Sequence, residues 1–329
     1  MLLISKADIK KVFSMRDAIE ADKTAFEMYS DGKAVAPLRT SIDVPRYKGQ
    51  NLFMPAYVEG LDSTGVKIVS VFPGNASRGK PVVPATMVLL DGETGEVCSL
   101  IDGTYLTQLR TGAAAGAASD MLAREDSKAG ALFGTGGQAA TQLEAMLAAR
   151  KLERVRVYDI DFDKAREFAA RMQSELKQYG AEIVPASSPA EAVDDADIIT
   201  TVTTSRNPVF NGTLVKKGCH INGVGAYTPE MQELDERLIA RADKIYVDAR
   251  EAALEEAGDL IIPMRKGIID RNRITGELGE VVLGRIAGRE KADEITVFKT
   301  VGFAVLDVVA AKMIYDRVLQ EGLGQKVEL

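Results

Sequence analysis

A glycine-rich turn between an apolar strand and a helix limits the fold of this chain more than any other feature. Gly134, Gly136 and Ala139 follow the apolar run 131–133 with the spacing G-x-G-x-x-A, and a helical apolar pattern begins directly after them. Glycine is needed where a strand turns sharply and where backbone approaches a bound group, and a small third residue lets helix and strand pack closely. The pattern predicts an α/β fold with a doubly wound parallel sheet.

An acidic residue at the end of the next strand indicates what the turn binds. Asp159 lies about 20 residues beyond the turn, where a carboxylate can accept hydrogen bonds from ribose hydroxyls. The helix N-terminus offers free N–H groups to phosphates. A glycine turn without a ligand is the alternative, but strand, helix and acid together favour a dinucleotide. Asp159 repels a 2′-phosphate, and Ile160 and Asp161 add no positive charge, so NAD(H) is expected and NADP(H) stays open.

Alternating strands and helices continue beyond the turn and predict a Rossmann-type domain. Ligands of open α/β sheets bind at the carboxyl ends of strands, which makes Thr203 and residues 222–224 candidate cofactor contacts. The predicted strands are 129–133, 154–158, 197–202, 219–224 and 244–247, and a last strand-like run is 295–298. The turn itself contributes Gly134, Gly136, Gly137 and Ala139.

The remaining segments predict a second, mixed α+β lobe. Residues 7–30 have a helical pattern, 39–91 alternate short apolar runs with turns, and 105–123 form a helix of small residues. The 329 residues exceed the roughly 250–300 at which single cores stop growing. The last helical pattern is expected to return to the first lobe. We therefore expect one domain of residues 1–122 with 303–329 and a dinucleotide-binding domain of residues 123–302.

Composition excludes several classes of function. A net charge of -7 and a pI near 5.1 make nucleic acid an unexpected partner. No apolar run approaches the roughly 18 residues of a membrane span, and the N-terminus does not resemble a signal peptide. Cys98 and Cys219 match no metal spacing or disulfide framework, so a cytoplasmic protein without a metal site is expected. His220 is the single histidine, which excludes His-based zinc sites and Ser-His-Asp triads.

Three cations of the first lobe are candidates for substrate binding and catalysis. Arg39, Lys67 and Arg110 stand among apolar or small neighbours. Arginine suits a two-pronged carboxylate contact, and a lysine beside two arginines has a lowered pKa that allows proton delivery near neutral pH. The alternative is that each is an exposed surface charge.

The chain resembles the ornithine cyclodeaminase/mu-crystallin family over nearly its whole length. The matching stretches are Arg39-Thr40, Met54-Pro55-Ala56, Lys67, Phe72-Pro73-Gly74-Asn75, Asp102-Gly103, Leu106-Thr107, Arg110-Thr111, 134–139, Val224-Gly225, 296–298 and Val301-Gly302. The resemblance implies a homodimer in which the first lobe and the returning helix bind substrate and form the dimer. It also implies that Arg39, Lys67 and Arg110 hold the carboxylate of a small amino or imino acid, with Met54, Tyr227 and Val301 as further substrate contacts. Its implied cofactor positions are Gln138, Asp159, Asn222, Gly223, Val224 and Thr300, and we add Thr111 and Thr203 as cofactor candidates.

Two departures from the family's cyclodeaminases favour a different reaction. Leu52 stands where those enzymes have a Glu for the substrate amine, and Tyr227 stands where they have an acid-base Asp. Residues 224–234, 251–259 and 298–302 resemble the members that reduce Δ1-pyrroline-2-carboxylate. We therefore expect reduction of that imine, or of Δ1-piperideine-2-carboxylate, to L-proline or L-pipecolate.

Other reactions within the family stay open. They are cyclodeamination of ornithine to proline and ammonia with recycled NAD, alanine dehydrogenation, and NAD(P)H binding of the mu-crystallin kind. Lys299 is expected either to add positive charge near the site or to lie at the surface.

Overall fold

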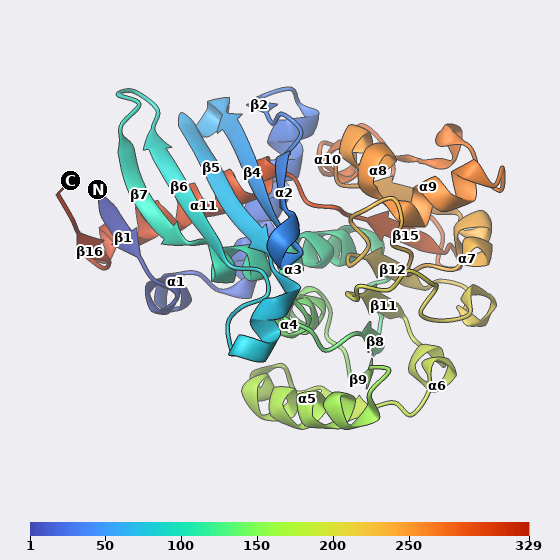
Figure 1. The fold of residues 1–329 in the computed structure, drawn as a ribbon. Coiled ribbons are helices and arrows are strands. Elements are labelled where there is room, and N and C mark those ends of the chain that lie inside the picture. The colour runs from blue at the N-terminus through green and yellow to red at the C-terminus, as the bar shows by residue number, and fades with distance from the viewer. Residues whose placement is uncertain (329) are drawn as a thin grey trace. The chain divides into compact units, whose positions relative to one another are not determined.

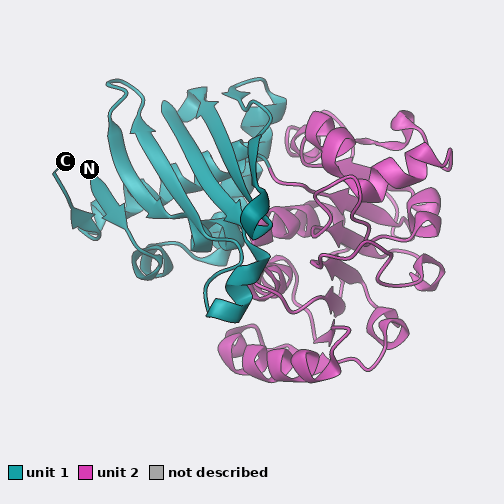
Figure 2. Cartoon of the chain, viewed as in Figure 1, with its two compact units in different colours: residues 1–110, 303–329 teal, residues 111–302 magenta. Residues whose placement is uncertain are grey.

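The computed structural model describes residues 1–328, and the chain divides into two compact units. Unit 1 consists of residues 1–110 and 303–329, and unit 2 of residues 111–302 (Figure 2). The C-terminal segment is therefore grouped with the N-terminal residues in one unit. The boundary falls inside one helix, Gly103–Leu122. The domain division expected from sequence, with its boundary at the end of that helix, stays a prediction.

Unit 1 combines one sheet with helices from both ends of the chain (Figure 1). The predicted helical region 7–30 is two helices, because Phe13 and Ser14 are extended and Ser14 caps the second helix. The elements are β1 (Leu2–Ile4), α1 (Lys6–Val12), α2 (Met15–Ser30), β2 (Ala34–Val35), β3 (Thr40–Val44), β4 (Gly49–Val58), β5 (Ser63–Val71), β6 (Ala85–Asp91), β7 (Val97–Asp102), the first part of α3 (Gly103–Leu122), α11 (Ala304–Gln320) and β16 (Gln325–Lys326).

The sheet of unit 1 is mixed and its order brings the two ends of the chain together. Its strands run β16-β1-β7-β6-β5-β4-β2, with β3 also paired to β4. Only β1 and β7 pair in parallel; the other pairs are antiparallel. Helix α11 packs on β4, β5 and β6 and against α2 (Figure 1). Its apolar residues cover the sheet and form the core of this unit.

A buried acid fixes α11 to the elements it covers. Asp307 lies in the first turn of α11 and is completely buried. Lys67 Nζ, on β5, donates to its Oδ2 at 2.7 Å, and Arg110 Nε, on α3, donates to its Oδ1 at 2.9 Å. Both cations are almost fully buried as well. Buried charges are tolerated only when paired, so this triad ties one helix, one strand and the C-terminal helix together.

Unit 2 is the parallel sheet that the glycine turn predicts. In Figure 1 helices lie on both sides of it, with α4 on one side and α6 and α7 on the other. The elements are β8 (Ala129–Phe133), α4 (Ala139–Ala149), β9 (Arg154–Tyr158), α5 (Phe162–Glu175), β10 (Glu182–Pro185), α6 (Pro189–Val193), β11 (Ile198–Thr201), β12 (His220–Gly223), α7 (Glu236–Arg241), β13 (Lys244–Val247), α8 (Arg250–Glu256), α9 (Gly258–Arg265), β14 (Gly276–Glu277), α10 (Leu278–Val282) and β15 (Thr296–Lys299).

Strand order in unit 2 follows the doubly wound pattern and then departs from it. The order is β10-β9-β8-β11-β12-β15-β13-β14, and every pairing is parallel. The five strands predicted beyond residue 127 are present. The sequence pattern misses β10 and β14, which contain no apolar run longer than two residues. The late strand β15 is inserted between β12 and β13.

The small residues of α3 allow the close packing that the sequence predicts. A Cβ on Gly112 would lie 2.5 Å from the carbonyl oxygen of Thr141, on α4. Any side chain at residue 112 would therefore push these two helices of unit 2 apart.

Across residues 1–328, α3 and the other helices lack the combination of length and apolar character that a membrane span requires.

We predict that Asp307→Ala strongly destabilises the protein, because it leaves two buried cations without a counter-charge. The expected loss is about 3–5 kcal/mol in the free energy of unfolding, measured by urea denaturation. Asp316→Ala is the matched control on the same helix. Asp316 is 45% exposed and pairs with Lys312, so its loss should change the free energy by less than about 1 kcal/mol. Equal effects of the two variants would contradict the structural role of Asp307.

Candidate active site

The backbone of the glycine turn in unit 2 has the geometry of an anion cradle. Gly134 has a φ of +101°, and a Cβ there would lie 2.8 Å from the carbonyl oxygen of Val202. Only glycine adopts this conformation in so little space. At Gly136 and Gly137 an added Cβ would meet no atom within 4 Å. The turn is therefore tight at its first glycine and open at the next two, which leaves room for a diphosphate.

Polar atoms left without partners surround the start of the following helix. Gln138 is the N-cap residue of α4, and no side chain caps the free N–H groups there. Its Oε1 is buried without a hydrogen-bond partner among the described residues, as is the hydroxyl of Thr111. Thr111 is near this turn, because its carbonyl accepts from Gln142 Nε2. Uncapped N–H groups, the helix dipole and the Thr111 hydroxyl, which can donate, fit a bound dinucleotide diphosphate, whereas Gln138 Oε1 can only accept a hydrogen bond.

Asp159 lies at the end of β9, next to the glycine turn. Its Oδ2 accepts hydrogen bonds from the backbone N–H and the hydroxyl of Thr135, at 3.0 and 2.7 Å. Its Oδ1 accepts from the N–H of Asp161. A carboxylate has about four acceptor positions, so Asp159 keeps capacity for a ribose hydroxyl. The neighbouring Ile160 is 95% exposed, which gives an apolar surface beside that carboxylate.

Asn222, a cofactor candidate, uses its side chain inside the protein. Its Nδ2 donates to the hydroxyls of Ser119 and Thr200, and its Oδ1 lies 3.0 Å from Nε2 of His220. Burial lowers the pKa of His220 to about 3, so this imidazole is neutral. The side chain of Asn222 therefore joins β11, β12 and α3 and is not directed at a ligand.

Other cofactor and substrate candidates of unit 2 gather at the carboxyl ends of β11, β12 and β15. The N–H of Val224 donates to the carbonyl of Thr201, which continues the pairing of β12 with β11. The hydroxyl of Thr300 and the N–H of Val301 both donate to Oδ2 of the buried Asp248. Thr203 and Gly223 lie at the same edge of the sheet, and Tyr227 is half-buried in the loop that follows β12.

Lys299 is completely buried, so its expected alternative as a surface residue is wrong. Its Nζ forms an ion pair with Asp259 Oδ2 at 3.0 Å and donates to the carbonyl of Gly223 at 3.1 Å. The sequence favoured a surface position because lysine is rarely buried without an acidic partner. The partner, Asp259, is forty residues away in sequence, so no local pattern indicated it.

Lys67 and Arg110, two of the three cations predicted in unit 1, meet at Asp307. Burial is the largest cause that lowers the pKa of Lys67, and the charge of Arg110 lowers it further. Asp307 opposes both through its charge and its hydrogen bond, while Arg39 adds a smaller lowering, and the resulting pKa is about 7. Arg39 is half-buried ahead of β3. Lys67 therefore titrates near neutral pH, chiefly through burial and less through the neighbouring arginines, and its catalytic role stays a prediction.

Arg110 still has a hydrogen-bonding group to offer. Only its Nε contacts Asp307, and its Nη1 is buried with no hydrogen-bond partner among residues 1–328. Asp22, on α2, is completely buried and neither of its carboxyl oxygens has a partner within the same residues. Burial raises the pKa of Asp22 well above its usual value, which disfavours its charged form, while the charge of Arg110 acts in the opposite direction. An anion that reaches Arg110 meets the unpaired Nη1 donor.

The surface beside Lys67 is apolar. Met54 on β4 is the direct cross-strand partner of Lys67, and Leu52 lies two residues away on the same face. Both side chains are buried. The sheet thus presents aliphatic groups, rather than the Glu that cyclodeaminases have, next to the titrating amine.

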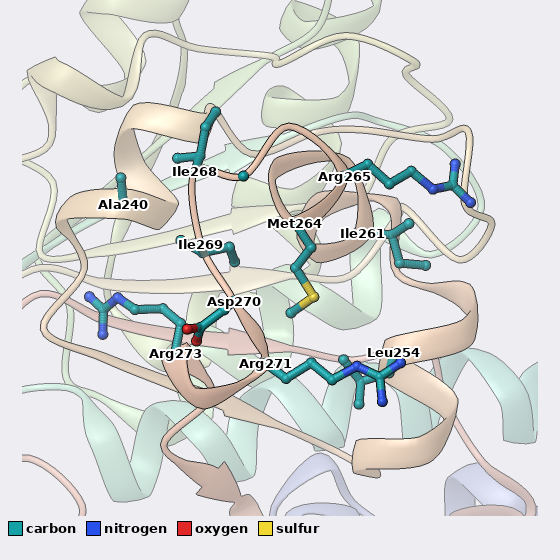
Figure 3. Close-up of a pocket in the computed structure, with 11 residues that line it drawn as sticks. Ala240, Leu254, Ile261, Met264, Arg265, Ile268, Ile269, Asp270, Arg271 and Arg273 are labelled. Atoms are coloured by element: carbon teal, nitrogen blue, oxygen red, sulfur yellow. The ribbon is translucent and has the colours of Figure 1, made fainter.

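A separate cavity of about 900 Å³ in unit 2 is not part of this arrangement. It lies beside α9 and the segment 267–273, with Ile261, Met264 and Ile269 in its lining (Figure 3). None of the residues predicted from sequence lines it. Its Arg265 and Arg273 extend in opposite directions in Figure 3, so their charges do not converge on one anion.

Sequence reasoning missed the acids that organise these sites. Asp307, Asp248 and Glu233 are buried and hold cations or backbone N–H groups. Asp307 had a visible signal, since it is the one charge in the apolar run 304–311. A lone carboxylate on the buried face of a helix implies a buried partner.

Comparison with known proteins identifies the family. The profile of the ornithine cyclodeaminase/mu-crystallin family matches residues 1–322. The chain is 40% identical over 328 residues, and 100% of both chains, to a Δ1-pyrroline-2-carboxylate reductase of Bacillus cereus. The solved structure of Thermococcus litoralis Δ1-pyrroline-2-carboxylate reductase with NADH and L-proline matches with a TM-score of 0.95 and 43% identity, over 99% of this chain and 100% of that one. An archaeal alanine dehydrogenase dimer with bound NAD matches with a TM-score of 0.91 and 36% identity, over 100% and 99%. The chain belongs to the ornithine cyclodeaminase/mu-crystallin family.

Proposed function

We propose that this protein reduces a cyclic imino acid with NADH, converting Δ1-pyrroline-2-carboxylate or Δ1-piperideine-2-carboxylate to L-proline or L-pipecolate. The observation that carries the proposal is the buried triad of Lys67, Asp307 and Arg110, in which a lysine titrates near neutral pH beside an unused guanidinium donor. The relatives named as reductases of this imine, and the one solved with NADH and L-proline, support the same reaction.

Each residue of the triad has a distinct role in the proposed reaction. Arg110, through Nη1, and Arg39 bind the carboxylate of the imino acid. NADH, when bound, supplies the hydride that the imine carbon accepts. Lys67 Nζ provides the proton for the imine nitrogen, so that the C=N bond becomes a secondary amine and the charges balance. Asp307 keeps Lys67 oriented and holds its pKa up against burial.

The apolar wall next to Lys67 suits a ring without a free amine. Leu52 and Met54 contribute methyl and methylene groups on the face that carries Lys67. An ornithine ammonium group placed there would lose water without gaining a counter-charge. This favours a cyclic imine over ornithine as the substrate.

We further propose that NAD(H) is preferred to NADP(H), that the enzyme is a homodimer and that it acts in the cytoplasm. Asp159 beside the glycine turn supports the cofactor preference. The archaeal alanine dehydrogenase solved as a dimer supports the oligomeric state. Cys98 and Cys219 are both free thiols, which suits a reducing compartment. We also propose that the substrate and dimerisation domain extends to residue 122.

The reaction is tested by following NADH absorbance with pyrroline-2-carboxylate, piperideine-2-carboxylate, and pyruvate plus ammonium, alongside ammonia release from ornithine. We predict turnover of a cyclic imine.

Lys67→Ala and Arg110→Ala should each lower kcat/KM by about a hundredfold or more while NADH still binds. The exposed Lys11→Ala and Arg46→Ala are matched controls with expected wild-type rates. Ammonia from ornithine without net NADH change would replace the proposal with cyclodeamination, and NADH consumption only with pyruvate would replace it with alanine dehydrogenation.

Cofactor preference provides a second test. Asp159→Ser should move the ratio of kcat/KM for NADPH over NADH upward by roughly tenfold, because it removes the negative charge that repels a 2′-phosphate. Asp163→Ser, at an exposed acid in the first turn of α5, should leave the ratio unchanged. An unchanged ratio in Asp159→Ser would show that this carboxylate does not face the ribose.

The pH profile tests the role of Lys67. Because the protonated amine is the donor, kcat for imine reduction should fall as pH rises through about 7. Asp307 raises the pKa of Lys67, so Asp307→Asn should move this fall to lower pH, whereas Asp316→Asn should not move it. A profile that keeps its midpoint in a folded Asp307→Asn variant would remove Lys67 from the proton transfer.

A further inference from the structure

A second buried ion cluster lies in unit 2, apart from the triad of the proposed reaction. Glu233, Asp259 and Lys299 are all completely buried. Lys299 Nζ pairs with Oδ2 of Asp259 at 3.0 Å, and Asp259 Oδ1 accepts the backbone N–H groups of Glu233 and Leu234 at 2.7 and 2.8 Å. Three ionisable groups without solvent are costly, so each needs these specific partners.

Glu233 uses both carboxylate oxygens to hold two separate loops. Oε1 accepts the backbone N–H of Thr203, which follows β11. Oε2 accepts the N–H groups of Gly225 and Ala226, which follow β12, at 2.6 and 2.9 Å. A Cβ on Gly225 would lie 2.1 Å from the carbonyl oxygen of Thr203, so the loops approach so closely that a side chain has no room. The carboxylate thus fixes the ends of two neighbouring strands against each other.

These two loops lie on one side of the glycine turn, and Asp159 lies on the other. The strand order β9-β8-β11-β12 puts Asp159 at the end of β9, the turn at the end of β8, and the loops held by Glu233 at the ends of β11 and β12. A dinucleotide with its diphosphate at the turn and its adenosine ribose at Asp159 extends its other half across β11 and β12. This placement rests on the proposed binding of NAD(H).

We propose that Glu233 is a positioning residue for the nicotinamide half of the cofactor, held in place by Asp259 and Lys299. It contacts no part of the cofactor. It sets the backbone of residue 203 and of residues 224–226, on which the nicotinamide half rests. The adenosine half depends on Asp159 and the turn, which Glu233 does not touch.

Glu233→Gln separates this role from general folding. Whichever way the amide is turned, its NH₂ group faces a backbone N–H, either of Thr203 or of Gly225 and Ala226, so one loop is released. Dissociation constants for NADH, by fluorescence, and for ADP-ribose, which lacks nicotinamide, by calorimetry, report the two halves. We expect about tenfold weaker NADH binding and an ADP-ribose constant within about twofold of wild type. Glu230→Gln, an exposed acid in the same loop, is the matched control with both constants unchanged.

Asp259→Asn supplies a conservative second variant. The amide oxygen still accepts from Glu233 and Leu234, while the charge facing Lys299 is lost, so the same selectivity for NADH is expected with a smaller loss. If Glu233→Gln does not fold, this variant alone decides. Equal weakening of NADH and ADP-ribose, or full NADH affinity in a folded Glu233→Gln protein, would overturn the positioning role. A wild-type protein that binds NADH but reduces no cyclic imine would instead refute the proposed reaction and leave this binding test intact.

Discussion

The carboxylate of Asp307 is the contact on which the rest of unit 1 depends. It accepts hydrogen bonds from Lys67 and Arg110, and it lies on the helix that completes the core of that unit. Burial lowers the pKa of Lys67, and a second cation beside it, Arg110, acts in the same direction. The negative charge of Asp307 raises the pKa of Lys67 again, so that it is about 7. Stability and the proposed proton transfer therefore rest on one ion triad.

Much of the fold could be predicted from the sequence because its signals are local. The glycine turn, the apolar run before it and the acid at residue 159 all lie within one strand-helix-strand unit, and the structure confirms that unit. The resemblance to the ornithine cyclodeaminase/mu-crystallin family is confirmed as well. Strands β10 and β14 could not be predicted, because β10 has only two apolar residues between a Glu and a Pro, and β14 consists of a Gly and a Glu, so neither forms an apolar run.

The candidate site was less predictable, because its contacts join distant parts of the chain. Lys67 and Arg110 stood out as cations among apolar residues, and the structure brings both to one acid. That acid is 240 residues from Lys67, and no local pattern links the two. Lys299 is the converse case, since its burial depends on Asp259. The sequence shows that a charged residue stands among apolar ones. Only the tertiary structure shows which oppositely charged residue pairs with it.

The position of β15 between β12 and β13 has a consequence for how the chain matures during translation. The strand that joins these two halves of the parallel sheet leaves the ribosome after all the others in unit 2. The helix α11 that covers the sheet of unit 1 follows only a few residues later. A nascent chain that stops before residue 296 leaves strand edges unpaired and Lys67 without its acid, the kind of surface that chaperones and proteases recognise. Both units therefore gain their last core element within the same short stretch, residues 296–320.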